Sequence, residues 1–194
     1  MEAKLNLHNG ETVGRKALLV IDIQENLVNP DSKFHIDTTG IDLLFDNLNE
    51  LIVKFNNNKD FVLYVVNEWT NPLLNLVTRN TCKKGGAGVG LDKRLVLVND
   101  TVYSKSKPNS LTNKELLKCL RDNNVETVYV MGLIAEECVK ATVKGLIKEQ
   151  FQVIVVEDAL GSKSDRNKNR VIGYLHENAI RTIKTKEFPV ISYK

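Results

Sequence analysis

The sequence predicts an α/β protein with a three-layer, doubly wound and mostly parallel sheet that has helices on both faces. Two observations support this fold class. Short and almost wholly apolar segments recur at residues 17–23, 61–66, 127–131 and 151–156, and strands that helices cover on both faces have this composition. Amphipathic helical patterns separate these segments, so strands and helices alternate as they do in a doubly wound sheet.

Four segments repeat apolar side chains at three- and four-residue spacing, which is the pattern of a helix with one buried face. They are residues 41–55, 112–123, 139–147 and 165–178. Thr112 and Glu115 have the spacing of a capping box, which predicts that the second of these helices opens at Thr112. A last short strand is expected near residues 181–185.

The composition is that of one ordinary globular domain. Of the 194 residues, 42% are hydrophobic and 26% are charged, which is enough apolar material for one full core. No internal repeat or linker interrupts the chain, so we predict a single domain over residues 1–194. The net charge of +3 comes from 27 basic and 24 acidic residues, and so small a balance predicts no nucleic-acid partner.

The sequence predicts neither a membrane span nor a secretion signal. The longest apolar run, residues 17–21, is far shorter than the roughly 20 residues that a membrane helix needs. Residues 1–5 lack the basic and apolar pattern of a signal peptide. The three cysteines, Cys82, Cys119 and Cys138, form no closely spaced pair. Their spacing predicts neither a disulfide framework nor a zinc site, and it indicates a reduced protein of the cytoplasm.

Three reactive side chains are expected beyond the carboxyl ends of the strands, where ligands bind in a doubly wound sheet. They are Asp22, Lys105 and Cys138. A helix that begins near Glu137 offers its free N–H groups and its dipole to the Cys138 thiol. These effects and a nearby lysine are expected to lower the pKa of that thiol. Asp22 would then accept the thiol proton.

The first predicted strand is not followed by a phosphate-binding glycine pattern. Residues 22–26 read Asp-Ile-Gln-Glu-Asn and contain no glycine, so a dinucleotide site is not expected. We therefore predict no cofactor.

Four segments occur in an order that resembles one superfamily of enzymes. They are the strand that ends at Asp22-Ile-Gln24, the lysine segment 105–111, the turn 132–139 with Cys138, and the strand that ends at Asp158-Ala159. Together they are similar to the isochorismatase-like cysteine hydrolases, which include nicotinamidases and N-carbamoylsarcosine amidases. The resemblance covers residues 16–185.

The resemblance implies a catalytic triad of Asp22, Lys105 and Cys138. Cys138 would attack a carbonyl carbon, and Asp22 would take the thiol proton. The backbone N–H groups of Ile134 and Cys138 would form the oxyanion hole, reached through a cis peptide bond between Leu133 and Ile134. The implied reaction is cleavage of a small amide or carbamoyl C–N bond through a thioester acyl-enzyme, which water then hydrolyses.

The substrate pocket and the identity of the lysine rest on position alone. Gln24, Leu27 and Trp69 follow predicted strands and are candidates for the pocket. Lys107 is a rival of Lys105, although the spacing to the following helix favours Lys105. We expect a small-molecule amide as the partner, and a homo-oligomer.

Nicotinamidases of this superfamily carry a histidine-rich metal site after the second strand. Here residues 67–72 read Asn-Glu-Trp-Thr-Asn-Pro, and the three histidines of the chain are His8, His35 and His176. Since no histidine lies in that segment, we predict a metal-independent enzyme. Whether Glu68 or another group binds a metal stays open.

Glu136 and Glu137 stand directly before Cys138, where family members often carry other residues. Two interpretations stay open. They are solvated acids that complement the helix dipole, or they raise the pKa of the neighbouring thiol.

Two other functions also stay open. An isochorismatase proper cleaves a vinyl ether with the aspartate as acid and needs no cysteine nucleophile, so the presence of Cys138 argues against it. A catalytically silent scaffold of the same fold is the second alternative, and the complete set of triad residues argues against that. Rapid and selective alkylation of Cys138 would indicate an activated nucleophile.

Overall fold

The centre of the molecule is a six-stranded parallel sheet with the strand order β5-β4-β3-β6-β7-β8. The structure is a computed structural model that describes residues 7–8, 11–12, 14–31 and 35–189; the segment 1–5 considered for a signal peptide lies outside them. The strands are β3 (Arg15–Ile21), β4 (Phe61–Asn67), β5 (Val102–Lys105), β6 (Val125–Gly132), β7 (Gln152–Leu160) and β8 (Arg181–Ile183). A separate antiparallel pair joins β1 (Leu7–His8) and β2 (Glu11–Thr12).

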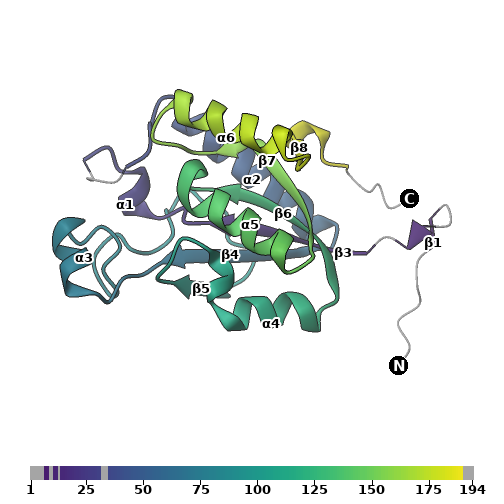
Figure 1. The fold of residues 1–194 in the computed structure, drawn as a ribbon, viewed down its shortest axis with the longest axis horizontal. Helices are drawn as coiled ribbons and strands as arrows, with labels where there is room; N and C mark the ends of the chain where they lie inside the picture. Colours follow the sequence, from purple (N-terminus) through teal and green to yellow (C-terminus); the bar gives the residue numbers. More distant parts are fainter. Residues whose placement is uncertain (1–6, 9–10, 13, 32–34, 190–194) are drawn as a thin grey trace.

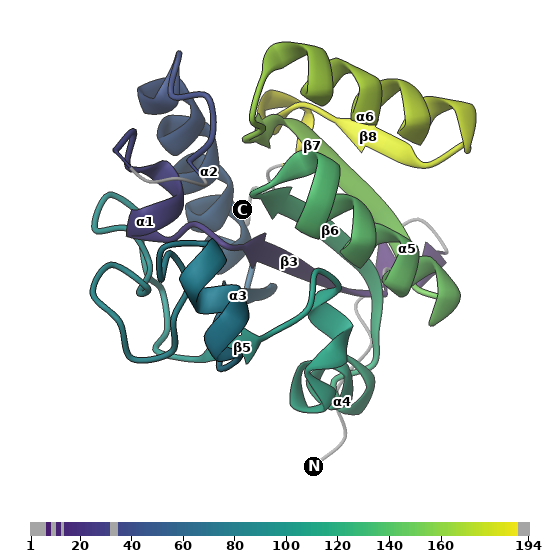
Figure 2. The ribbon, with the colours of Figure 1, turned by 60° about the vertical axis from the view of Figure 1, so that its left-hand side comes forward.

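Helices cover both faces of the sheet, as Figures 1 and 2 show. On one face lies α2 (Ile41–Asn57), whose apolar side packs in the same core as α1 (Glu25–Val28). On the other face lie α4 (Lys114–Asp122), α5 (Lys140–Lys148) and α6 (Asp165–Glu177). The short helix α3 (Pro72–Val77) follows β4. The predicted three-layer α/β fold is confirmed.

The position of β3 in the middle of the sheet explains why its sequence is apolar without alternation. Leu18 and Val20 pack in the core under α2, whereas Leu19 and Ile21 pack in the core under α4, α5 and α6. Because both faces of the strand are buried, both sets of side chains are hydrophobic. No described helix is long and apolar enough to cross a membrane.

The predicted capping box at Thr112 is wrong. Thr112 belongs to a short 3-10 turn, η1 (Ser110–Thr112), and α4 begins at Lys114. The cap is Asn113, whose side-chain oxygen accepts the N–H groups of Glu115 at 2.9 Å and Leu116 at 3.0 Å. Two asparagines explain the shift, since Asn109 caps the 3-10 turn and Asn113 then caps the helix.

The place where the strand order reverses lies between β3 and β6. From β3 the chain proceeds through β4 to β5 on one side of the sheet, and from β6 through β7 to β8 on the other. Crossover connections therefore leave a crevice beyond the carboxyl ends of β3 and β6. The fold predicts a ligand site there, next to Asp22 and the turn that follows Gly132.

Gly132 keeps β3 and β6 close at this edge. Its φ is +117°, and a side-chain Cβ at this position would lie 2.2 Å from the backbone oxygen of Ile21. We expect Gly132→Ala to lower the free energy of unfolding by about 3 kcal/mol, since it adds a backbone clash to a strained conformation. Urea denaturation measures this. The control is Gly173→Ala in α6, where no atom lies within 4 Å and no loss is expected; equal stabilities of the two variants would contradict the prediction.

Candidate active site

Asp22 is the first residue after β3, and its backbone turns away from the strand in a left-handed conformation with φ 55°. Its N–H still donates to the carbonyl of Val65 in β4 at 2.8 Å. This bond fixes the turn, so the carboxylate lies at the carboxyl edge of the sheet with 1% of its side chain exposed.

Lys105 joins the other two predicted triad residues. It is the last residue of β5, and its Nζ donates to Asp22 Oδ2 at 2.7 Å and to Cys138 Sγ at 3.4 Å. The Lys105 side chain is fully buried, whereas Lys107 is exposed to solvent. The expected convergence of Asp22, Lys105 and Cys138 is therefore confirmed, and Lys105 rather than Lys107 makes the contact.

Cys138 lies in a π-helical turn, η2 (Ala135–Val139), that leads directly into α5. The helical segment thus begins earlier than the sequence predicted, and Cys138 lies inside its first turn. The predicted cis peptide bond between Leu133 and Ile134 is present. Among the described residues, no hydrogen-bond acceptor faces the backbone N–H of Ile134.

Burial dominates the electrostatics of the site. It raises the pKa of the Cys138 thiol above its usual range, and the Asp22 carboxylate raises it further, while Lys105 acts in the opposite direction. The expected lowering of this pKa is therefore wrong, because burial and the acid outweigh the lysine and the helix. Burial likewise raises the pKa of Asp22 against the lowering effect of Lys105. In the resting site the Cys138 thiol is therefore protonated.

A cavity of about 250 Å³ opens onto the triad, and its wall includes Asp22 and Cys138. Leu27 and Trp69 line it, as predicted, while α3 contributes Leu74 and Val77. The cavity is small and mostly apolar, so its shape and chemistry suit a compact substrate.

The family model of the isochorismatase domain matches residues 16–187 of the chain. The chain belongs to the isochorismatase family. Its relatives include the uncharacterized isochorismatase family protein YddQ of Bacillus subtilis, which is 27% identical over 161 residues that cover 82% of this chain and 85% of YddQ.

Solved structures share the fold of this isochorismatase-family hydrolase. The pyrazinamidase of Pyrococcus horikoshii, solved in complex with zinc, is 21% identical with a TM-score of 0.75, and the match covers 88% of this chain and 99% of that one. The N-carbamoylsarcosine amidase of Thermoplasma acidophilum is 22% identical with a TM-score of 0.75, and the match covers 90% and 98%.

Gln24 does not line the cavity of this family member, and its predicted role there is wrong. Its side chain is fully buried, where Nε2 donates to the carbonyl of Asn67 at 3.1 Å and Oε1 accepts the N–H of Asn67 at 2.8 Å. Nε2 also donates to the carbonyl of Val89. Gln24 therefore joins the ends of β3 and β4 to the loop around Val89.

The two acids before Cys138 have separate roles in the isochorismatase-family structure. Glu136 is half-buried and accepts hydrogen bonds from the Ser162 hydroxyl at 2.6 Å and from the Asn167 amide at 2.9 Å. Glu137 forms an ion pair with Lys163 and lines the cavity. The solvated-acid interpretation is therefore wrong for Glu136, because it ties η2 to the start of α6.

The residues present do not fit the zinc that the Pyrococcus relative binds. No three histidine, cysteine, aspartate or glutamate side chains come together to hold a metal ion anywhere in residues 7–8, 11–12, 14–31 and 35–189. Glu68, left open as a metal ligand, instead accepts the Ser104 hydroxyl at 2.6 Å. This pairing holds the carboxylate against β5.

Sequence reasoning missed several residues of the cavity wall, among them Asn67 and Cys82. The position of Asn67 at the end of β4 was a usable signal, since polar residues at strand ends face ligands in this fold. Cys82 carried no such signal, because it lies in a loop that only the tertiary structure brings to the site. Burial raises the pKa of Cys82 to about 12, so this second thiol stays protonated.

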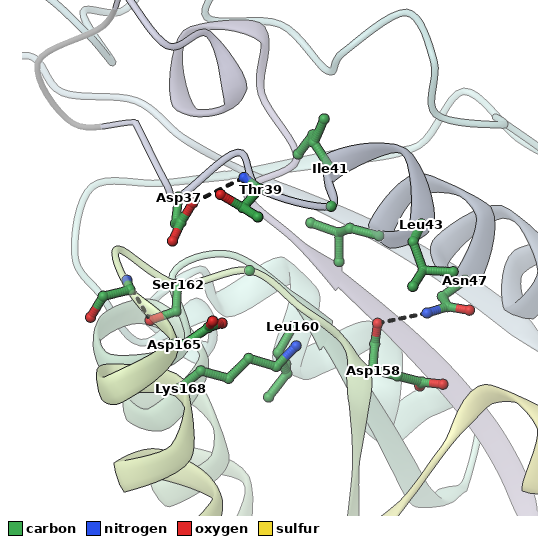
Figure 3. A pocket seen from close by; sticks show the side chains of 14 residues that line it. Asp37, Thr39, Ile41, Leu43, Asn47, Asp158, Leu160, Ser162, Asp165 and Lys168 are labelled. Carbon is green, nitrogen blue, oxygen red and sulfur yellow. Dashed lines mark hydrogen bonds between the residues drawn. The ribbon is translucent and has the colours of Figure 1, made fainter.

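A second cavity, of about 230 Å³, lies between the starts of α2 and α6 (Figure 3). Its wall is charged and includes Asp37, Asp158 and Lys168, but none of the three triad residues. Asp158 is already engaged there, since one of its oxygens accepts both the N–H and the hydroxyl of Thr185 at 2.9 Å. This cavity is separate from the candidate active site.

Proposed function

We propose that this isochorismatase-family hydrolase is a cysteine hydrolase that cleaves a small amide or carbamoyl C–N bond without a metal. The observation that carries the proposal is the buried contact of Lys105 Nζ with both Asp22 and Cys138. A nucleophile, a carboxylate and a cation within hydrogen-bond reach are the parts that nucleophilic acyl transfer requires.

The first half of the reaction forms the thioester. Cys138 Sγ attacks the carbonyl carbon of the substrate while its proton moves to Asp22, whose Oδ1 has no hydrogen-bond partner among the described residues. The negative charge on the carbonyl oxygen is stabilised by the N–H groups of Ile134 and Cys138. Asp22 then gives the proton to the nitrogen, the C–N bond breaks and the amine leaves.

The second half releases the acid. A water molecule attacks the thioester carbon while Asp22 takes its proton. The C–S bond breaks, and the sulfur recovers the proton from Asp22. Lys105 keeps its positive charge throughout, because the buried carboxylate and the thiol hold its pKa above the usual value although burial acts to lower it.

The names of two structural relatives support an amide substrate. One is an N-carbamoylsarcosine amidase and the other a pyrazinamidase, and their names indicate cleavage of a carbamoyl and a carboxamide C–N bond. The cavity of about 250 Å³ suits molecules of similar size.

The charge of the cavity argues against the vinyl-ether alternative. Its described wall includes two acids, Asp22 and Glu137, and no lysine, arginine or histidine. The nearby cations Lys105 and Lys163 are already paired with Asp22 and Glu137, so a carboxylate-bearing substrate such as isochorismate would have to compete for a counter-charge, which costs free energy. Neutral amides meet no such penalty.

A panel of small carboxamides and N-carbamoyl compounds, with detection of released ammonia, tests the proposal. We expect ammonia from at least one member and a transient acyl-enzyme on Cys138 that mass spectrometry detects. Release of the amine with no covalent adduct, even when turnover is slowed by low temperature, would contradict the thioester.

The homo-oligomeric state and the location in the cytoplasm stay predictions. Size-exclusion chromatography with light scattering tests the oligomeric state.

Activity is expected to survive removal of metals. The segment that follows β4 offers Asn67, Glu68 and Asn71 rather than histidines, and the Glu68 carboxylate is bound to Ser104. Dialysis against EDTA should therefore leave kcat/KM for the best panel amide unchanged. Loss of activity that zinc or manganese restores would contradict the metal-independent mechanism.

A further inference from the structure

Asn67 is a buried polar residue of the cavity wall whose side-chain oxygen has no hydrogen-bond partner among the described residues. It lies at the end of β4 with 7% of its surface exposed. Its Oδ1 is buried and has no hydrogen-bond partner among the residues that the structure describes. A buried amide oxygen without a partner costs stability, so a native structure that contains one calls for an explanation.

The backbone of Asn67 is held firmly while its side chain is not. The Gln24 side chain binds both the N–H and the carbonyl of Asn67, and the N–H of the next residue, Glu68, donates to the carbonyl of Lys105 at 2.7 Å. These bonds fix the backbone of Asn67, and with it the point beside the triad from which its side chain starts. Its carboxamide is therefore a preformed recognition group.

The chemistry of that group indicates its ligand. A carboxamide has one acceptor and two donors in a plane, so it pairs best with a group that also presents N–H and C=O in a plane. We propose that Asn67 is a substrate-positioning residue that hydrogen-bonds the unsubstituted amide or carbamoyl group of the substrate. The inference rests on the proposed function, and it assigns the selection of amides over esters to this side chain.

The position of Asn67 relative to Asp22 gives the hydrogen bond between Asn67 and the substrate amide a role in the reaction. Both residues line the same cavity at the ends of neighbouring strands. An Asn67 oxygen that accepts one N–H of the leaving amino group orients the nitrogen toward the proton that Asp22 delivers. An ester has no such N–H, so it gains nothing from Asn67.

The variant Asn67→Leu tests this, because leucine has nearly the same shape and no hydrogen-bonding group. Binding is measured by ligand-observed NMR on Cys138→Ala protein with and without Asn67→Leu. The probes are primary carboxamides from acetamide to benzamide and the methyl ester of the acid whose amide binds best. We expect amide binding to weaken at least about tenfold and ester binding to change less than about twofold.

The Tm of the Asn67→Leu variant distinguishes a positioning role from a structural one, because loss of a structural residue would lower the Tm. Because Asn67→Leu removes an unpaired buried polar group, its Tm should equal or exceed that of the parent protein. Asn58→Leu is the matched control, since Asn58 is 9% exposed, has an unpartnered Nδ2 and caps the end of α2 outside the cavity. It should leave amide binding unchanged.

Several results would overturn the inference. They are equal weakening of amide and ester, a Tm several degrees below the parent, unchanged amide binding, or no carboxamide binding to the Cys138→Ala protein at all. The proposed function fails separately. If carboxamides bind through Asn67 but the parent protein releases no ammonia from them, the inference stands and the hydrolase proposal is wrong.

Discussion

Replacing Cys138 with alanine is expected to abolish hydrolysis and leave the fold intact. Among the described residues, Lys105 Nζ hydrogen-bonds Asp22 and Cys138, whereas Cys82, the other thiol of the cavity wall, is not hydrogen-bonded to it. No described neighbour therefore replaces the lost nucleophile. Turnover should fall by roughly 10⁴-fold or more, as it does when the nucleophile of other hydrolases is removed. Loss of one small buried thiol should cost only about 1 kcal/mol of stability, which thermal unfolding measures.

Cys119→Ala is the matched control for this variant. Cys119 lies on α4, outside the cavity, so the variant should keep the parent rate. Substantial turnover by Cys138→Ala would contradict the thioester mechanism. It would favour the vinyl-ether type of chemistry, in which the aspartate acts as an acid and no cysteine nucleophile is needed.

Asp22→Asn is also expected to abolish turnover, but it should make Cys138 react faster with iodoacetamide. An asparagine cannot take the thiol proton, so the attack on a carbonyl fails. In the parent protein, burial and the Asp22 charge both raise the pKa of the thiol, against Lys105. Removing the Asp22 charge therefore lowers this pKa and increases the fraction of thiolate at neutral pH.

The pH dependence of the alkylation rate shows whether the pKa of Cys138 falls or rises in Asp22→Asn. A thiol reacts as the thiolate, so the alkylation rate rises as the pH approaches the pKa, and a lower pKa moves the whole curve to lower pH. A decrease of one unit raises the rate about tenfold at pH 7. Mass spectrometry of the labelled peptide separates Cys138 from the partly exposed Cys119. Slower labelling of Asp22→Asn at every pH would show that Asp22 itself generates the thiolate.

The layers of the fold could be predicted from the sequence, because a strand that is buried on both faces has a continuous apolar sequence. In β3 every residue from Ala17 to Ile21 is buried, and the run is apolar without alternation. The helix α2 shows its buried side at three- and four-residue spacing. Helix boundaries were less readable, because Thr112 and Asn113 are both good caps and only the preceding 3-10 turn decides between them.

The convergence of the triad was also predictable, because Asp22, Lys105 and Cys138 stand in segments whose order resembles one family. The resemblance indicates which residue types meet at one sheet edge. Their electrostatics were not predictable, since the pKa of the Cys138 thiol depends on how completely the site is buried.

The sequence by itself determined the fold class and indicated that Asp22, Lys105 and Cys138 meet at one edge of the sheet. The tertiary structure alone decided which polar side chains face the cavity. Gln24 and Asn67 are both polar residues at strand ends. The Gln24 amide hydrogen-bonds the backbone of Asn67, whereas the Asn67 side-chain oxygen has no partner among the described residues. The physical reason is that a buried amide takes whichever partners lie within about 3 Å, and those partners come from other strands and loops.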